Sequence, residues 1–118
     1  MNVNDSCHLD HEALKELREV MEEEFDVLIS TFLQDSADRI VHLRQALSGQ
    51  EVDTFTKAAH SLKGSCINIG APLLGELCLA AEAAGRAGNL QQGQAQVEAI
   101  EQEFRHVDEA LRAYLQQS

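Results

Sequence analysis

Apolar residues recur at helical spacing through the middle of the chain, and this periodicity constrains the fold more than any other feature. They lie three or four positions apart and are Phe55, Ala59, Leu62, Cys66 and Ile69. Residues at this spacing form one continuous apolar face of a helix, which packs against other helices. His60 falls on the opposite face, so its imidazole is expected to stand in or near solvent.

Similar patterns before and after this segment predict an all-α protein. We expect an antiparallel up-down four-helix bundle with an additional short N-terminal helix. A single domain is expected over residues 1–118, with residues 1–8 flexible. The expected helices span about 10–21, 23–48, 51–69, 72–87 and 90–116. The chain has one proline and seven glycines, which also favours helices over a sheet.

The charge of the chain limits its partners. The formal net charge is -11 and the pI is about 4.7, which argues against nucleic acid or an anionic membrane as the partner. A protein partner is expected. The acidic N-terminus has no apolar targeting segment and no run spans a bilayer, so a cytoplasmic location is predicted. The three cysteines, Cys7, Cys66 and Cys78, are not expected to form a structural disulfide.

The neighbours of His60 on its helix indicate the chemistry that it performs. Lys63 lies at i+3 and Gly64 at i+4, beside His60 on the same face. A glycine inside a helix costs about 1 kcal/mol relative to alanine, and here it is expected to keep the imidazole uncrowded for a large partner. An accessible neutral imidazole is a nucleophile, and a nearby ammonium neutralises an incoming phosphoryl group. The combination predicts a phosphohistidine at His60.

The motif around His60 resembles a known family. The run His60-Ser61-Leu62-Lys63-Gly64-Ser65-Cys66, followed by Gly70-Ala71, is similar to the signature of the histidine-containing phosphotransfer (HPt) domain. That family relays phosphoryl groups between receiver domains and folds as a four-helix bundle. The resemblance implies that His60 is the phosphorylated residue, supported by Lys63 and Gly64.

The same resemblance implies the partners of the chain. We expect it to accept a phosphoryl group from the receiver domain of a hybrid sensor kinase and to pass it to the receiver domain of a response regulator. The receiver is expected to bring Mg²⁺, while this chain needs no cofactor of its own. We therefore expect a monomeric, stand-alone carrier without autonomous kinase activity.

The register of the expected hairpin brings one carboxylate toward His60. If the turn is centred on Ala71, residues 60 and 82 each lie eleven positions from it, and equal rise per residue places them at the same height. Glu82 is thus expected to face His60, where its carboxylate would fix the imidazole tautomer. The family often carries Gln or Glu at the matching position. The alternative is that Glu82 is an ordinary exposed carboxylate.

Charge along the chain suggests where a partner docks. Residues 1–50 carry eleven acids and four bases, whereas residues 51–70 carry two of each, so only the segment around His60 is neutral. This pattern predicts an isolated cationic patch of Lys57 and Lys63, toward which an acidic phosphorylated pocket could be steered. Thr56 and Ile67 are further docking candidates, although a single exposed apolar residue is common.

Two other classes of function were weighed. A di-iron bundle needs two Glu-x-x-His motifs, and only Glu103 to His106 fits one. Cys7, His8 and His11 lack a fourth zinc ligand, so no metal site is predicted. The remaining alternative to the carrier is a non-catalytic helical interaction module that binds a receiver or kinase without phosphate transfer.

Overall fold

Helices make up nearly all of the chain that can be described, and the expected all-α class is confirmed. The computed structural model describes residues 8–116, and this part contains no strand. Its elements in chain order are α2 (His11–Met21), the short 3-10 helix η1 (Glu22–Glu24), α3 (Phe25–Ser48), α4 (Val52–Ile69), α5 (Pro72–Arg86) and α6 (Gly93–Leu115). No helix within residues 8–116 is long and apolar enough to cross a membrane.

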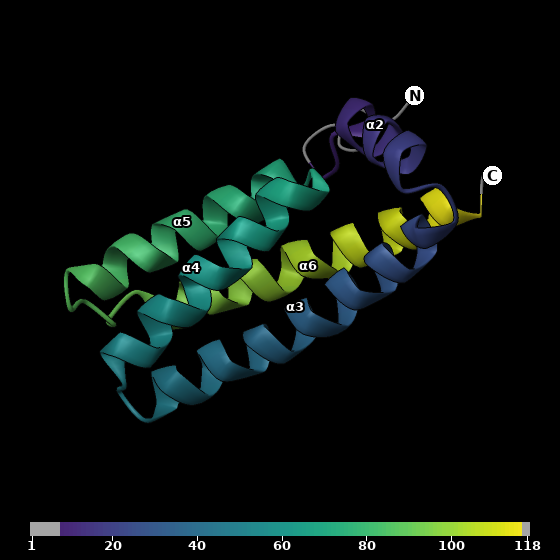
Figure 1. Ribbon diagram of the computed structural model, residues 1–118. Coiled ribbons are helices and arrows are strands. Elements are labelled where there is room, and N and C mark those ends of the chain that lie inside the picture. The colour runs from purple at the N-terminus through teal and green to yellow at the C-terminus, as the bar shows by residue number, and fades with distance from the viewer. Residues whose placement is uncertain (1–7, 117–118) are drawn as a thin grey trace.

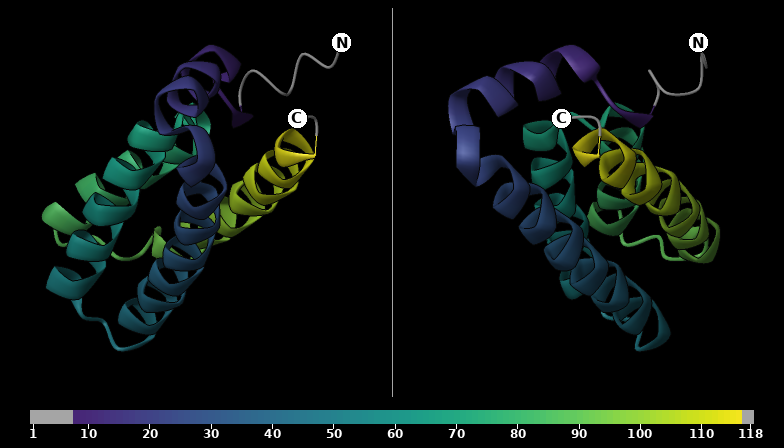
Figure 2. Two further views of the ribbon diagram at one scale, coloured as in Figure 1. Left: turned by 45° about the vertical axis from the view of Figure 1, so that its right-hand side comes forward. Right: turned by 90° about the vertical axis from the view of Figure 1, so that its right-hand side faces the viewer.

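The four longer helices lie side by side as an up-down bundle, as the sequence predicts (Figures 1 and 2). Short connections join successive helices, so each runs against the one before it. Helices α4 and α5 make the most extensive contact of any pair. The residues on these two helices are therefore held in a close and well-defined register.

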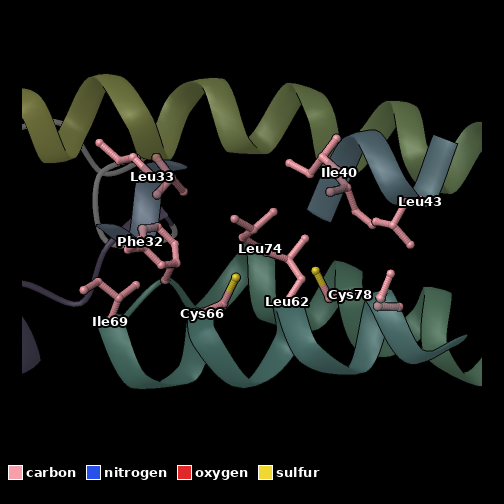
Figure 3. Close-up of a cluster of buried hydrophobic side chains, with 14 of the residues drawn as sticks. Phe32, Leu33, Ile40, Leu43, Leu62, Cys66, Ile69, Leu74 and Cys78 are labelled. Atoms are coloured by element: carbon pink, nitrogen blue, oxygen red, sulfur yellow. The ribbon is translucent and has the colours of Figure 1, made fainter. Parts of the chain in front are cut away.

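The core lies between the inner faces of these helices. Every residue of the apolar stripe predicted for α4 is buried, with at most 3% of its surface exposed. Figure 3 shows Leu62 and Cys66 of α4 beside Leu74 and Cys78 of α5. Because the inner face of α4 is buried in the core, the polar residues between the apolar positions must face outward.

Two of the three cysteines lie in this core and are free thiols. Cys66 and Cys78 are completely buried and form no disulfide, as expected. A hydrogen bond with Cys78, followed by burial, raises the pKa of the Cys66 thiol. The thiolate is therefore disfavoured, and Cys66 acts as a small apolar residue. Cys7 lies outside the described residues.

A tight turn sets the register of α4 and α5. Gly70 adopts a left-handed backbone with φ of 84°, and its amide and that of Ala71 bond to the carbonyl oxygen of Cys66. Glycine takes this conformation without the steric cost that other residues incur. Pro72 then occupies the first turn of α5, where its missing N–H is not needed. The turn lies where the sequence predicted it.

The short helix α2 covers the end of the bundle that contains this turn (Figure 1). The amide of Asp10 donates to the carbonyl oxygen of Gly70 at 2.7 Å. The Asp10 side chain also caps α2, accepting a hydrogen bond from the amide of Ala13. The guanidinium of Arg18 lies over the rings of Phe25 and Tyr114, 5.7 and 5.4 Å from their centroids. These contacts fix α2 across three elements of the bundle.

One expectation about the start of a helix was wrong. The last helix, expected from residue 90, begins at Gly93, because the Asn89 side chain accepts from the amide of Gln91 and favours a turn. The flexibility expected for residues 1–8 stays a prediction. Residues 1–7 lie outside the described residues, but His8 is held by Glu103, with His8 Nδ1 2.6 Å from Glu103 Oε2.

Candidate functional site

His60 stands on the outward face of α4, as the periodicity of that helix predicts. Its side chain is 62% exposed, although its neighbours in sequence, Ala59 and Leu62, are buried. One ring nitrogen is engaged within the protein: Nδ1 lies 2.7 Å from Oε2 of Glu82. The other, Nε2, points away from Glu82. The imidazole is thus anchored on one side and accessible on the other.

Glu82 is a buried carboxylate, not the ordinary exposed one of the alternative interpretation. It lies on α5 with 2% of its surface exposed, and it faces His60 as predicted. Lys63 Nζ donates to Oε1 at 2.7 Å, and Arg86 Nη2 donates to Oε2 at 2.7 Å. We call His60, Lys63, Glu82 and Arg86 the Glu82 cluster. Its four side chains come from α4 and α5 alone.

The charge state of Glu82 determines the tautomer of His60. Hydrogen bonds from Lys63, then from Arg86 and His60, lower the pKa of Glu82 from 4.5 to about 2, although burial opposes this shift. Glu82 is consequently ionised near neutral pH and can only accept hydrogen bonds. The proton between the two side chains must belong to Nδ1 of His60. In the neutral imidazole Nε2 then carries a free lone pair.

The predicted isolated patch of two lysines is wrong. Lys63 is only 22% exposed, because its ammonium is bound to the buried Glu82. Lys57 is exposed but pairs with Asp53, with Nζ 3.0 Å from Oδ2. Both lysines have carboxylate partners that their spacing to His60 did not reveal. The cationic character of the site comes from Lys63 and Arg86 together, which outweigh the single charge of Glu82.

Arg86 is the member of the cluster that the sequence analysis missed. It follows Glu82 by four positions on α5, the spacing at which helical side chains form ion pairs. This signal was present in the sequence. It was not used because Glu82 was considered only as a partner of His60.

Gly64 leaves open space beside the imidazole. A Cβ atom added there would meet no heavy atom within 4 Å. An alanine side chain here would not touch the imidazole in the free chain, and the access role expected for Gly64 stays a prediction. A helix-interior glycine costs about 1 kcal/mol and has no packing reason here. The vacant space is available to a molecule that approaches α4 from outside.

The remaining docking candidates lie in different surroundings. Ile67 is 67% exposed, one turn beyond Lys63 on α4. Thr56 is half-buried, and its hydroxyl donates to the carbonyl oxygen of Val52 at 2.8 Å. Thr56 also packs so closely against α5 that a Cβ atom on Gly85 would overlap it. Of these candidates, Ile67 is the one turned fully outward.

The residues considered for metal binding form another kind of cluster. The ring of His8 stacks on that of His106 with centroids 4.7 Å apart, and His8 Nδ1 contacts Glu103. Stacked rings direct their nitrogens side by side and not toward a common point. Within residues 8–116, no group of three or more His, Cys, Asp or Glu side chains could hold a metal ion.

Comparisons with known proteins identify the family of this chain. A family model described as the Hpt domain matches residues 27–117. The chain is 39% identical to histidine-containing phosphotransfer protein B (HptB) of Pseudomonas aeruginosa, with a TM-score of 0.91 and coverage of 94% of this chain and 96% of that chain. None of the curated proteins compared with the chain matches it.

Two plant structures share the fold at lower identity. ZmHP2, a histidine-containing phosphotransfer protein from maize, is 18% identical with a TM-score of 0.80, covering 89% of this chain and 87% of its own. A rice protein is 17% identical with a TM-score of 0.85, covering 95% and 84%. The family model spans nearly all of α3 to α6, and the identity to HptB extends over almost the whole chain. The chain therefore belongs to the Hpt domain family and takes part in histidine phosphotransfer in a phosphorelay.

Proposed function

We propose that Nε2 of His60 accepts a phosphoryl group from the aspartyl phosphate of a receiver domain and passes it to a second receiver. The observation that carries this proposal is the hydrogen bond of 2.7 Å between His60 Nδ1 and Glu82. It holds the proton on the inner nitrogen and leaves the outer nitrogen as the nucleophile. His60 is also the one exposed residue in the run from 60 to 66 that resembles the HPt signature.

The transfer step balances without any group from outside the two proteins. The lone pair of Nε2 attacks phosphorus in line, the P–N bond forms, and the P–O bond to the aspartate breaks. The receiver aspartate leaves as a carboxylate. The imidazole keeps its Nδ1 proton and becomes positively charged, and the ionised Glu82 stabilises that charge across the existing hydrogen bond. Transfer to the second receiver is the reverse reaction.

The surface around His60 supports docking of a protein that brings the rest of the machinery. Open space at Gly64 admits the rim of a partner's pocket, and Ile67 offers an apolar contact one turn away. Lys57 and Thr56 flank the same face of α4 at its N-terminal end. We assign the Mg²⁺ needed for transfer to the acidic pocket of the receiver and not to this chain.

The family assignment makes this protein a phosphoryl carrier. We propose a monomer in the cytoplasm that has no autonomous kinase activity. Its partners are the receiver domain of a hybrid sensor kinase and the receiver domain of a response regulator. The net negative charge supports a protein partner over nucleic acid.

The test is transfer from phosphorylated receivers to the wild type and to His60→Gln. A panel of receiver domains is phosphorylated with radiolabelled acetyl phosphate and mixed with each protein. Acid-labile, base-stable label should appear on the wild type and be absent from His60→Gln. His42→Gln is the matched control, because His42 is also an exposed helical histidine and should label normally. Receiver binding without label on the wild type would support the non-catalytic module instead.

A further inference from the structure

Arg86 binds the site through Glu82 and not through His60. Its side chain is 67% exposed, yet its guanidinium makes two hydrogen bonds to Glu82 Oε2, from Nη2 at 2.7 Å and from Nε at 3.2 Å. Lys63 occupies the other oxygen, Oε1, at 2.7 Å. The two cations are thus attached to different oxygens of the same buried carboxylate.

This arrangement matters because the ammonium of Lys63 would have to bind both Glu82 and a phosphoryl group on His60. In the resting protein it neutralises Glu82, whereas a phosphoryl group on His60 would need the same ammonium. If Lys63 turned away in a protein without Arg86, the buried carboxylate of Glu82 would keep only the imidazole of His60 as a partner. Such a charge is strongly unfavourable. Lys63 could then serve the phosphoryl group only at the expense of Glu82.

We propose that Arg86 is a positioning residue that keeps Glu82 neutralised and in contact with His60 while Lys63 moves to the phosphoryl group. This inference rests on the proposed function of His60. Arg86 does not need to touch the phosphoryl group in this role. It allows Lys63 to exchange a carboxylate for a phosphate.

The geometry of the guanidinium suits this role. Its rigid fork holds Oε2 with two donors, so the orientation of the carboxylate is maintained when Oε1 is released. Oε2 is also the oxygen that accepts from His60 Nδ1, so the hydrogen bond that fixes the tautomer is on the side that Arg86 holds. Departure of Lys63 therefore leaves the nucleophile correctly oriented.

The experiment measures the effect of Arg86→Ala on the rate of transfer from a receiver that labels the wild type. The effect is determined in the wild type, in Lys63→Ala and in Glu82→Gln. In the wild type we expect a loss of about tenfold, the size of one charge-assisted hydrogen bond. In Glu82→Gln the loss should be less than about twofold, because that side chain carries no charge for Arg86 to neutralise. In Lys63→Ala the loss should be at least as large as in the wild type, because Arg86 is then the remaining basic side chain on Glu82.

Arg112→Ala is the matched control. Arg112 is also 67% exposed and pairs with a carboxylate four residues earlier, Asp108, at 2.7 Å, but it lies on α6. This variant should transfer at the wild-type rate. If the double variant Lys63→Ala, Arg86→Ala does not fold, the effect of Arg86→Ala in Glu82→Gln alone tests the proposal. The Glu82→Gln protein has no buried carboxylate to neutralise.

The outcomes separate this inference from the proposed function. Absence of label on wild-type His60 would overturn the proposed function. Normal labelling of the wild type, with Arg86→Ala equally fast, would overturn only the role of Arg86. A tenfold loss that persists in Glu82→Gln would also overturn it, since Arg86 would then act on the phosphoryl group directly and not through Glu82.

Discussion

Replacing Gly85 by alanine tests how closely α5 must approach α4. A Cβ atom on Gly85 would lie 2.2 Å from Oγ1, 3.1 Å from Cβ and 3.2 Å from Cα of Thr56. Rotation of the hydroxyl could relieve the first overlap, but it would break the bond to the carbonyl oxygen of Val52. The other two overlaps involve atoms that rotation does not move, so α5 must retreat by a few tenths of an ångström.

The expected cost follows from these contacts. Overpacking of a close interface costs about 1–3 kcal/mol, and loss of the hydroxyl bond adds about 1 kcal/mol. Alanine regains at most about 1 kcal/mol of helix propensity, and less near the end of α5. The free energy of unfolding should therefore fall by about 2 kcal/mol, which lowers Tm by roughly 8 °C in a chain of this size. Glu82 lies one turn earlier on α5, so phosphate transfer should slow as well.

Urea denaturation and thermal melts measure this change, with Gly64→Ala as the matched control. A Cβ atom on Gly64 meets open space, so this variant should be more stable by about 1 kcal/mol. Thr56→Ala in the Gly85→Ala background removes the shortest overlap and should show a favourable coupling of roughly 1 kcal/mol. If Gly85→Ala stabilises the protein as Gly64→Ala does, the close approach of the two helices is refuted.

Three further predictions concern the charge and burial of individual side chains. Because the pKa of Glu82 falls from 4.5 to about 2 on folding, the stability it contributes is present above pH 4.5 and is lost as the pH falls toward 2. The difference in unfolding free energy between the wild type and Glu82→Gln should change over that window in urea titrations, and a constant difference would contradict the shift. Leu62→Ala should cost about 2–5 kcal/mol, whereas Ile67→Ala should cost less than about 0.5 kcal/mol. If chemical denaturation shows that Leu62→Ala and Ile67→Ala lower the free energy of unfolding equally, the two faces of α4 are assigned wrongly. Cys66 and Cys78 should resist Ellman's reagent until the protein unfolds, and rapid modification of either in the native state, located by mass spectrometry, would show that the core is open.

The helices and the facing pair of His60 and Glu82 could be predicted because their signals are local. Spacing of apolar residues defines the inner face of a helix, and Gly70 with Pro72 defines where one helix ends and the next begins. Once the turn is located, equal rise along two antiparallel helices determines which residues lie at the same height. The contact between His60 and Glu82 follows from counting residues.

The hydrogen-bond network around Glu82 could not be predicted by counting residues. Register shows that Glu82 lies near His60, but not that burial draws Lys63 and Arg86 to the same carboxylate. An unpaired buried charge is costly, so nearby cations reorient toward it, and burial depends on how closely α4 and α5 pack. The predicted isolated patch of Lys57 and Lys63 was wrong at Lys63 for this reason.

The sequence by itself determined the helical class, the turn at Gly70, the outward orientation of His60 and the family motif. Each of these depends on the conformation of one segment or on the spacing between neighbours in sequence. Only the tertiary structure decided that α2 bonds to Gly70, that His8 pairs with Glu103, and that the ion pairs converge on Glu82. Apart from the pair of Glu82 and Arg86, which the spacing along α5 already indicates, these contacts join residues far apart in sequence. Their energies depend on burial and on interatomic distances that arise only when the helices pack together.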